Sequence, residues 1–141
     1  MADTTQQITL SAELESLSAF RNHVKTICQN ISGLDEQAIY DLQLAVDEIC
    51  TNIITHGYAG MDPGSIILRV EVGTEDLVVT ITDFGHAFEP VEPPAPDPNA
   101  SLEEREIGGL GLFFVHSSVD DIEYESSPTG NTTRLIKKFA K

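Results

Sequence analysis

The chain has 141 residues, of which 40% are hydrophobic, so it holds enough apolar material for one core and too little for two. We therefore expect a single domain over residues 1–141. A net charge of −15 argues against a direct nucleic-acid partner and against an anionic membrane surface. The acidic excess fits attraction of a basic protein partner, and it fits a simple gain in solubility equally well.

Alternating hydrophobicity predicts five strands. They cover Gln6–Leu10, Ser65–Val72, Asp76–Thr82, Asp121–Ser126 and Thr132–Phe139. Helical spacing of apolar residues predicts three helices, at Ala12–Asn30, at a segment that Asp35 caps and His56 closes, and at Gly108–Ser118. Together they predict an α/β two-layer sandwich with a mixed, largely antiparallel sheet and three helices on one face.

The second predicted helix carries a carboxylate and a carboxamide beside its apolar stripe. At about 100° per residue, Glu48 and Asn52 lie roughly 40° apart on the border of that stripe. A Glu side chain can accept a proton, and an amide oxygen is a suitable ligand for Mg²⁺. Taken alone, the pair is also what an ordinary amphipathic helix presents to solvent.

Two glycine-bearing segments follow this helix. The strand that ends in Asp83-x-Gly85 leaves a carboxylate at the end of the sheet beside a flexible backbone. Gly109-x-Gly111 precedes an apolar helix, where phosphate oxygens can approach backbone N–H groups. Each segment alone is also a common kind of turn. Neither is a Walker loop or a dinucleotide-binding fingerprint.

Taken together, four motifs resemble, in order and spacing, the N, G1, G2 and G3 boxes of the GHKL (Bergerat-fold) ATPases. They are Glu48-x-x-x-Asn52, Asp83-x-Gly85, Gly109-x-Gly111 and Gly130-Asn131-Thr132. The sequences DEICTNIITHGY and GNTTRL make the chain most similar to the anti-sigma-factor serine/threonine kinases of this superfamily. The resemblance extends from about Leu10 to Phe139.

The resemblance implies a role for each matching residue. Glu48 would be the general base or would orient the nucleophile, and Asn52 would bind the Mg²⁺ of Mg-ATP. Asp83 would accept a hydrogen bond from the adenine amino group. The other nucleotide contacts would come from Gly85, Ala87, Arg105, Gly109, Leu110, Gly111, Leu112 and Thr132.

Two features of the region around the first glycine motif bear on this resemblance. Ala87 stands where the family commonly has a second glycine, which narrows the backbone options there but is small enough for binding to survive. Residues 89–107 occupy the position of the superfamily's ATP lid. The segment Glu89–Arg105 holds five of the seven prolines, so it cannot pack as a core element. An inert acidic loop has the same composition.

The resemblance implies an ATP-dependent kinase of the anti-sigma type. It would phosphorylate a serine or threonine of a small antagonist (anti-anti-sigma) protein and, in its other state, sequester a sigma factor. Arg21 matches a position where the family presents a basic side chain to its partner, although a solvated helix arginine fits as well. The family also suggests a homodimer.

Two other functions stay open at this point. One is an ATP-binding regulatory module that sequesters a partner without phosphoryl transfer. The other is a detached catalytic domain that acts on a histidine-containing helix of another protein.

The cysteines and the first residues of the chain predict a cytoplasmic location. Cys28 and Cys50 have no metal-ligand spacing and form no Cys-x-x-Cys motif, which favours buried thiols in a reducing compartment. The N-terminal residues lack the basic and apolar regions of a signal peptide, and no apolar run is long enough to span a membrane.

Overall fold

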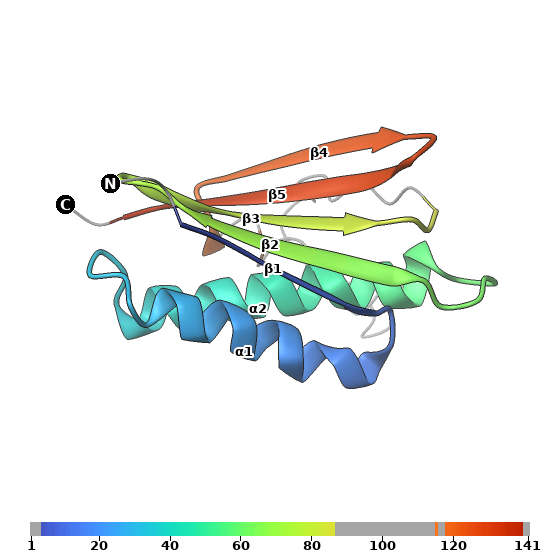
Figure 1. Ribbon diagram of the computed structural model, residues 1–141, viewed down its shortest axis with the longest axis horizontal. Coiled ribbons are helices and arrows are strands. Elements are labelled where there is room, and N and C mark those ends of the chain that lie inside the picture. The colour runs from blue at the N-terminus through green and yellow to red at the C-terminus, as the bar shows by residue number, and fades with distance from the viewer. Residues whose placement is uncertain (1–3, 87–114, 116–117, 140–141) are drawn as a thin grey trace, which may run out of the picture.

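The described residues form a two-layer structure in which two helices cover one face of an antiparallel sheet (Figure 1). This computed structural model describes residues 4–86, 115 and 118–139. The sheet order is β1-β2-β3-β5-β4. The strands are β1 (Thr4–Ser11), β2 (Ser65–Val72), β3 (Asp76–Asp83), β4 (Asp121–Ser127) and β5 (Gly130–Lys138). The helices are α1 (Leu17–Cys28) and α2 (Glu36–Asn52), with short turns η1 (Leu14–Ser16) and η2 (Ile53–Gly57).

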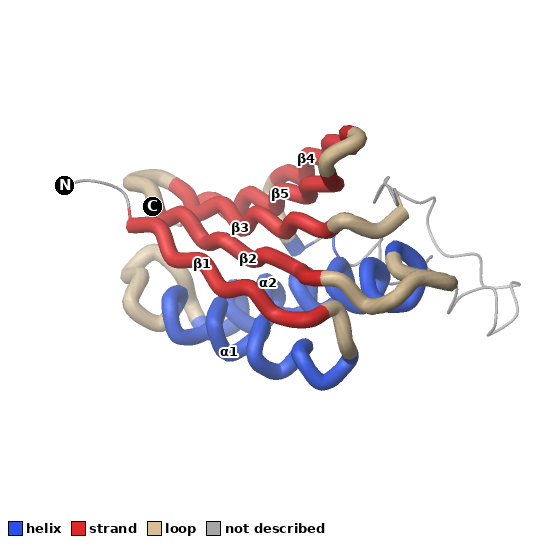
Figure 2. The backbone as a smooth tube through the Cα atoms, turned by 45° about the vertical axis from the view of Figure 1, so that its right-hand side comes forward, coloured by secondary structure: helices blue, strands red, loops and turns tan. Residues whose placement is uncertain are grey.

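The predicted two-layer α/β arrangement is confirmed, but the sheet is not mixed. All four pairings between the described strands are antiparallel. The connection between β1 and β2 contains two helices, α1 and α2, which lie side by side under the sheet (Figure 2). When one helix connects two strands, the second strand runs parallel to the first. A second connecting helix reverses the direction of the chain once more, so the next strand runs antiparallel. β2 therefore runs antiparallel to β1.

The predicted count of three helices is not supported, since the described residues contain two α-helices. Of the predicted third helix at 108–118, only Val115 and Ser118 lie within the described residues, and both are helical. The first α-helix begins later than predicted. The Ala12 N–H donates to the Gly64 carbonyl at 2.8 Å, so this stretch is still tied to the segment before β2. None of the described helices is long and apolar enough to cross a membrane.

The hydrophobic core lies between the sheet and the two helices. The strands β2, β3 and β5 contribute alternate buried residues to it, and α2 contributes positions three or four residues apart. The largest fully buried apolar side chains are Phe20, Val24, Leu42, Val46, Ile66, Leu68, Val70, Leu77, Val79, Ile81, Val115 and Leu135. This interface fixes α2 against the sheet, and thereby fixes the residues at the end of α2.

The inward-facing positions become polar at one end of this core. On β3 the alternation that buries Ile81 carries Asp83 onto the same inner face. On β5 the same alternation buries Asn131 and Thr133. The strand register places Asp83 directly opposite Asn131, so their side chains are cross-strand neighbours. Asn52, at the last position of α2, is also buried.

The capping of α2 gives a test of the local structure. As predicted, Asp35 is the N-cap, and its carboxylate accepts the Ala38 N–H at 2.8 Å. We expect Asp35→Ala to lower the free energy of unfolding by about 0.5–2 kcal/mol, because an N–H of the first turn loses its partner. Asp35→Asn is the matched control, since an amide oxygen can accept the same bond. Urea denaturation of both variants measures the difference, and equal losses would contradict the capping interpretation.

Candidate functional site

Asp83 is a buried carboxylate at the inner end of β3, with 4% of its surface exposed. Its Oδ1 accepts hydrogen bonds from the Gly85 N–H and from Asn131 Nδ2, both at 3.0 Å. A buried carboxylate is costly unless it is hydrogen-bonded, so these donors make the core position tolerable. Both donors act on the same oxygen. Within the described part of the chain no donor reaches Oδ2, which leaves that atom to accept a bond from a ligand.

A small cavity of about 10 Å³ lies beside this carboxylate. Its walls come from α2 and η2 on one side and from the ends of β3 and β5 on the other, and consist of Ile49, Asn52, Ile53, Gly57, Asp83, His86 and Thr133. Apolar side chains with a few buried polar groups are typical of a site for a flat ligand with polar edges. The volume is close to that of one water molecule, so a larger ligand requires a wall to move.

Asn52 brings an amide group into the wall of this cavity. Its side chain is 6% exposed, and its Nδ2 has no hydrogen-bond partner among the described residues. Leaving such a donor unsatisfied costs about 1–3 kcal/mol, and exceptions of this kind in native proteins call for an explanation. Because the Asn52 amide is unsatisfied among the described residues and lies beside a cavity, it is a candidate for binding a ligand there.

Glu48 lies one turn before Asn52 on α2 and is partly buried, but it is not a wall of the small cavity. Burial raises the pKa of the Glu48 carboxyl above its ordinary value, and the neighbouring Asp47 charge raises it further. A carboxyl group with a raised pKa is a better proton acceptor once ionised. Glu48 thus has the electrostatic surroundings of a general base.

Gly85 lies where the turn after β3 contacts the turn after α2, and this contact leaves no room for a side chain. A Cβ at this position would overlap the carbonyl oxygen of Gly57 and lie 2.6 Å from its carbon. The His86 N–H donates to that same oxygen at 2.5 Å. The turn after β3 is therefore fastened to the turn after α2. Sequence analysis indicated a flexible backbone at Gly85 but did not identify Gly57 as its neighbour.

Tyr58 fixes the end of β3 from the same side. Its hydroxyl accepts the Phe84 N–H at 2.9 Å and donates to the Ser65 carbonyl at 2.8 Å. Burial raises the pKa of the Tyr58 phenol, against the lowering effect of the Phe84 N–H, and the Asp83 charge adds to the rise. The phenol therefore stays protonated and can donate, which holds the first residue of β2 against the segment that follows Asp83.

The structure places Thr133, rather than the predicted Thr132, in the wall of the cavity. Thr133 is 3% exposed, whereas Thr132 pairs with Thr82 on the face of the sheet away from the helices. Successive strand residues face opposite sides, so counting back by twos from Leu135 identifies Thr133 and Asn131 as inward-facing. The sequence held this signal for both residues.

Arg21, the predicted partner-binding residue, lies on α1 but contacts α2. Its guanidinium forms a salt bridge with Asp47, at 2.5 Å between Nη1 and Oδ1, and its side chain is 38% exposed. Its carbonyl oxygen accepts from Gln43 Nε2 at 3.3 Å. Arg21 therefore sits beside the segment of α2 that carries Glu48, and part of its surface remains accessible.

The remaining predicted site residues cannot be placed. Ala87, Arg105, Gly109, Leu110, Gly111 and Leu112 lie outside the described residues, as does the predicted lid at 89–107.

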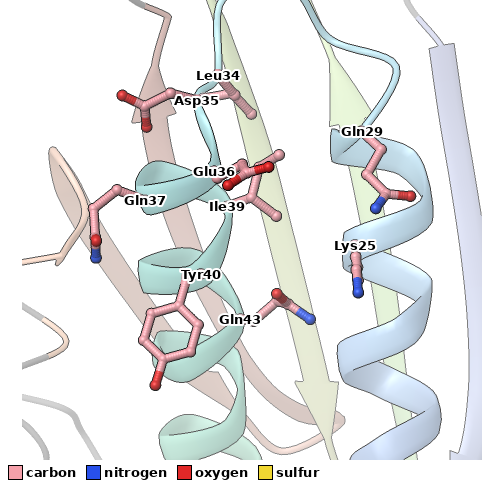
Figure 3. A pocket seen from close by; sticks show the side chains of 9 residues that line it. All are labelled: Lys25, Gln29, Leu34, Asp35, Glu36, Gln37, Ile39, Tyr40 and Gln43. Carbon is pink, nitrogen blue, oxygen red and sulfur yellow. The ribbon is translucent and has the colours of Figure 1, made fainter.

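A larger groove of about 850 Å³ lies between α1 and the first turns of α2 (Figure 3). It is lined by Lys25, Gln29, Leu34, Asp35, Glu36, Gln37, Ile39, Tyr40 and Gln43. Its polar side chains are mostly long and exposed, and Gln43 is already roughly 14 Å along the helix from Asn52. The groove has room for a ligand but lacks buried polar groups that would orient one. The small cavity has three such groups.

Comparison with known proteins shows the family to which this chain is similar. Residues 10–137 match the family described as histidine kinase-like ATPase domain. The chain is 32% identical to serine-protein kinase RsbW of Listeria monocytogenes, with 98% of this chain and 92% of the relative covered. It is 29% identical to the anti-sigma F factor of Clostridium novyi over 79% of each chain.

A solved structure supports the fold. The crystal structure of the RsbU and RsbW domains of Rv1364c from Mycobacterium tuberculosis superposes with a TM-score of 0.70 at 19% identity. The similarity covers 98% of this chain and 33% of that chain. At this level of identity the likeness concerns the fold alone.

The contact between Gly85 and Gly57 predicts a specific loss of stability. We expect Gly85→Ala to lower the free energy of unfolding by about 1–3 kcal/mol, because the added methyl group overlaps a backbone carbonyl. Gly60 serves as the control: it has a φ of 75° with nothing within 4 Å of an added Cβ. Asn tolerates that conformation, so Gly60→Asn should cost less. Urea denaturation compares the two, and a smaller cost at Gly85 than at Gly60 would contradict the packing argument.

The raised pKa of Glu48 predicts how its removal changes stability with pH. The folded protein holds this proton more tightly than the unfolded chain, whose carboxyl titrates near the ordinary value of 4.5. The stabilising contribution of Glu48 to the free energy of unfolding is therefore fully present below pH 4.5, and it is lost as the pH rises through the pKa of the folded protein. We expect Glu48→Gln to be more stable than the wild type at pH 7, with the difference shrinking toward pH 4. Denaturation at both pH values tests this, and a pH-independent difference would count against it.

Proposed function

The chain belongs to the family of histidine kinase-like ATPase domains, and on that basis we propose that it is an ATP-dependent serine/threonine protein kinase of the anti-sigma type. It phosphorylates a small antagonist (anti-anti-sigma) protein and, in the other state of the switch, holds a sigma factor. The observation that carries the proposal is the convergence of buried Asn52 and Asp83 on one cavity. Relatives named serine-protein kinase and anti-sigma F factor support the activity and the partners.

Asp83 recognises the adenine base. Its Oδ2 accepts a hydrogen bond from the exocyclic amino group, while Oδ1 is occupied by protein donors. The apolar side chains of Ile49 and Ile53 line the same cavity and suit the faces of a purine. Guanine carries an oxygen at the corresponding position and cannot donate to the carboxylate. This arrangement therefore favours ATP over GTP.

Asn52 provides an oxygen ligand for Mg²⁺. A carboxamide oxygen is neutral and hard, which suits this cation, and Asn52 lies in the wall of the small cavity. Bound Mg²⁺ supplies positive charge that offsets the charge of the phosphates. A chain with a net charge of −15 repels a polyanionic ligand, so this compensation decides whether the triphosphate binds.

Glu48 accepts the proton of the attacking hydroxyl. It lies one helical turn from Asn52, which places the base near the metal-binding amide and outside the small cavity. Its raised pKa lies closer to neutral pH, and a general base is most effective when its pKa is near the working pH. Transfer requires a serine or threonine hydroxyl to approach in line with the leaving group.

Partner proteins contact the face that carries Arg21. This side chain is part-exposed on α1 and is held by Asp47 close to the segment of α2 that carries Glu48. A partner bound there lies within reach of the catalytic helix. We include in the proposal a cytoplasmic location, which the cysteine pattern favours, and a homodimer, which the family resemblance suggests.

Phosphoryl transfer and nucleotide binding can be separated on α2. Wild-type protein incubated with Mg-ATP and candidate antagonist proteins should place phosphate on a serine or threonine, which mass spectrometry locates. We expect Glu48→Gln to bind ATP but to transfer phosphate about 10²–10⁴-fold more slowly, because the base is lost. Asn52→Ala should instead lose the Mg²⁺-dependent part of nucleotide binding, as measured by titration calorimetry.

Three outcomes decide between the functions. Transfer by Glu48→Gln at the wild-type rate would remove Glu48 from the chemistry. Binding of ATP by the wild type without transfer to any antagonist would favour a regulatory module that holds a partner without catalysis. Phosphate on a histidine would favour a detached histidine kinase domain.

A further inference from the structure

Asn131 links the carboxylate of Asp83 to two other parts of the site. Its Nδ2 donates to Asp83 Oδ1 and to the Gly85 carbonyl oxygen, both at 3.0 Å. Its Oδ1 accepts from Ser126 Oγ at 2.7 Å. The register of the sheet brings these residues together, because Asn131 lies opposite Asp83 on β3 and opposite Ser126 on β4. The side chain is 3% exposed.

The partners of Asn131 determine which way its amide faces. Asp83 Oδ1 and the Gly85 carbonyl oxygen can only accept hydrogen bonds, so the nitrogen must lie toward them. The amide oxygen then lies toward Ser126, whose hydroxyl can donate. Both N–H groups and the oxygen are therefore engaged, and the side chain has one favourable orientation.

This orientation determines how Asp83 is presented to a ligand. The Gly85 N–H and Asn131 Nδ2 both approach Oδ1, and two donors on one oxygen restrict rotation of the carboxylate about its last bond. Without Asn131 only the Gly85 N–H would hold Oδ1, and the two oxygens could exchange places. Asn131 also holds the carbonyl of Gly85, so it fixes both the carboxylate and the turn beside it.

We propose that Asn131 is a positioning residue for base recognition: it holds Asp83 so that Oδ2 meets the exocyclic amino group of a 6-aminopurine. This rests on the proposed function, in which Asp83 reads adenine. Asn131 itself does not contact the nucleotide in this role. Ser126 supports it from the neighbouring strand, so preference for the amino group depends on three residues on three strands.

A pair of ligands separates this role from a purely structural one. ATP carries the 6-amino group, and purine riboside 5′-triphosphate lacks only that group. We expect the wild type to prefer ATP by about tenfold or more, the value of a hydrogen bond to a charged group. Asn131→Ala should weaken ATP binding by about tenfold and leave the analogue within about twofold. Titration calorimetry with Mg²⁺ measures all four affinities, and thermal unfolding checks each variant.

Two further variants complete the test. Thr80→Ala changes an outward-facing residue of β3, opposite Arg134 on β5, and should leave both affinities unchanged. Ser126→Ala removes the donor to Asn131 Oδ1 at an exposed position, where loss of folding is not expected. It should weaken ATP binding by roughly twofold to threefold, which is less than the full effect of losing a neutral hydrogen bond. Binding of the analogue should not change. Ser126→Ala thus tests the proposal even where Asn131→Ala does not fold.

The outcomes distinguish this proposal from the function on which it rests. Equal weakening of both triphosphates by Asn131→Ala, or no weakening of either, would overturn the positioning role. For Ser126→Ala, an unchanged preference for ATP would do the same. A wild type that binds ATP no better than purine riboside triphosphate would instead overturn the adenine-reading role of Asp83, before any variant is considered.

Discussion

A carboxylate at a core position of β3 is the constraint on which the candidate site depends. The alternation that buries Leu77, Val79 and Ile81 also buries Asp83. Bulk solvent barely reaches a carboxylate that is 4% exposed, so the protein supplies donors to it. They come from the cross-strand neighbour Asn131 and from the chain two residues further on.

The donor from Gly85 has consequences for the end of the helical layer. To bring its N–H back to Asp83, the chain turns so tightly that Gly85 lies against the Gly57 carbonyl. That carbonyl belongs to η2, a single π-helical turn in which the Tyr58 N–H donates to Ile53 at 2.9 Å. A π turn is wider than an α turn and is frequent near functional sites. The turn therefore joins the end of α2, with Asn52, to the end of β3.

Much of this arrangement could be predicted from the sequence where the signal is local. The strand pair at Ser65–Val72 and Asp76–Asp83 and the cap at Asp35 follow from alternation and helix-capping chemistry. The ordered motifs identified the family, and two of their residues, Asn52 and Asp83, meet in the cavity. The prediction of a largely antiparallel sheet was right and only its mixed character was wrong, since the two helices between β1 and β2 give an antiparallel pairing.

What could not be predicted depends on contacts between distant segments. The overlap of Gly85 with Gly57 and the raised pKa of Glu48 exist only once α2 has docked on the sheet. The place of Asn131 depends on register, which pairs residues 48 positions apart in the chain. A motif locates a polar residue, whereas tertiary packing determines which of its atoms remain available to a ligand.

The charged residues of α2 contribute both to the candidate site and to the contact with α1. Burial raises the pKa of Glu48, the Asp47 charge raises it further, and Asp47 also forms the salt bridge with Arg21 on α1. Because the guanidinium offsets part of the Asp47 charge, it limits the effect of Asp47 on the neighbouring carboxyl. The ion pair is part-exposed and contributes little to stability. Its place on α2 is what links it to the site: one member of the pair, Asp47, adds to the rise in the Glu48 pKa that burial causes.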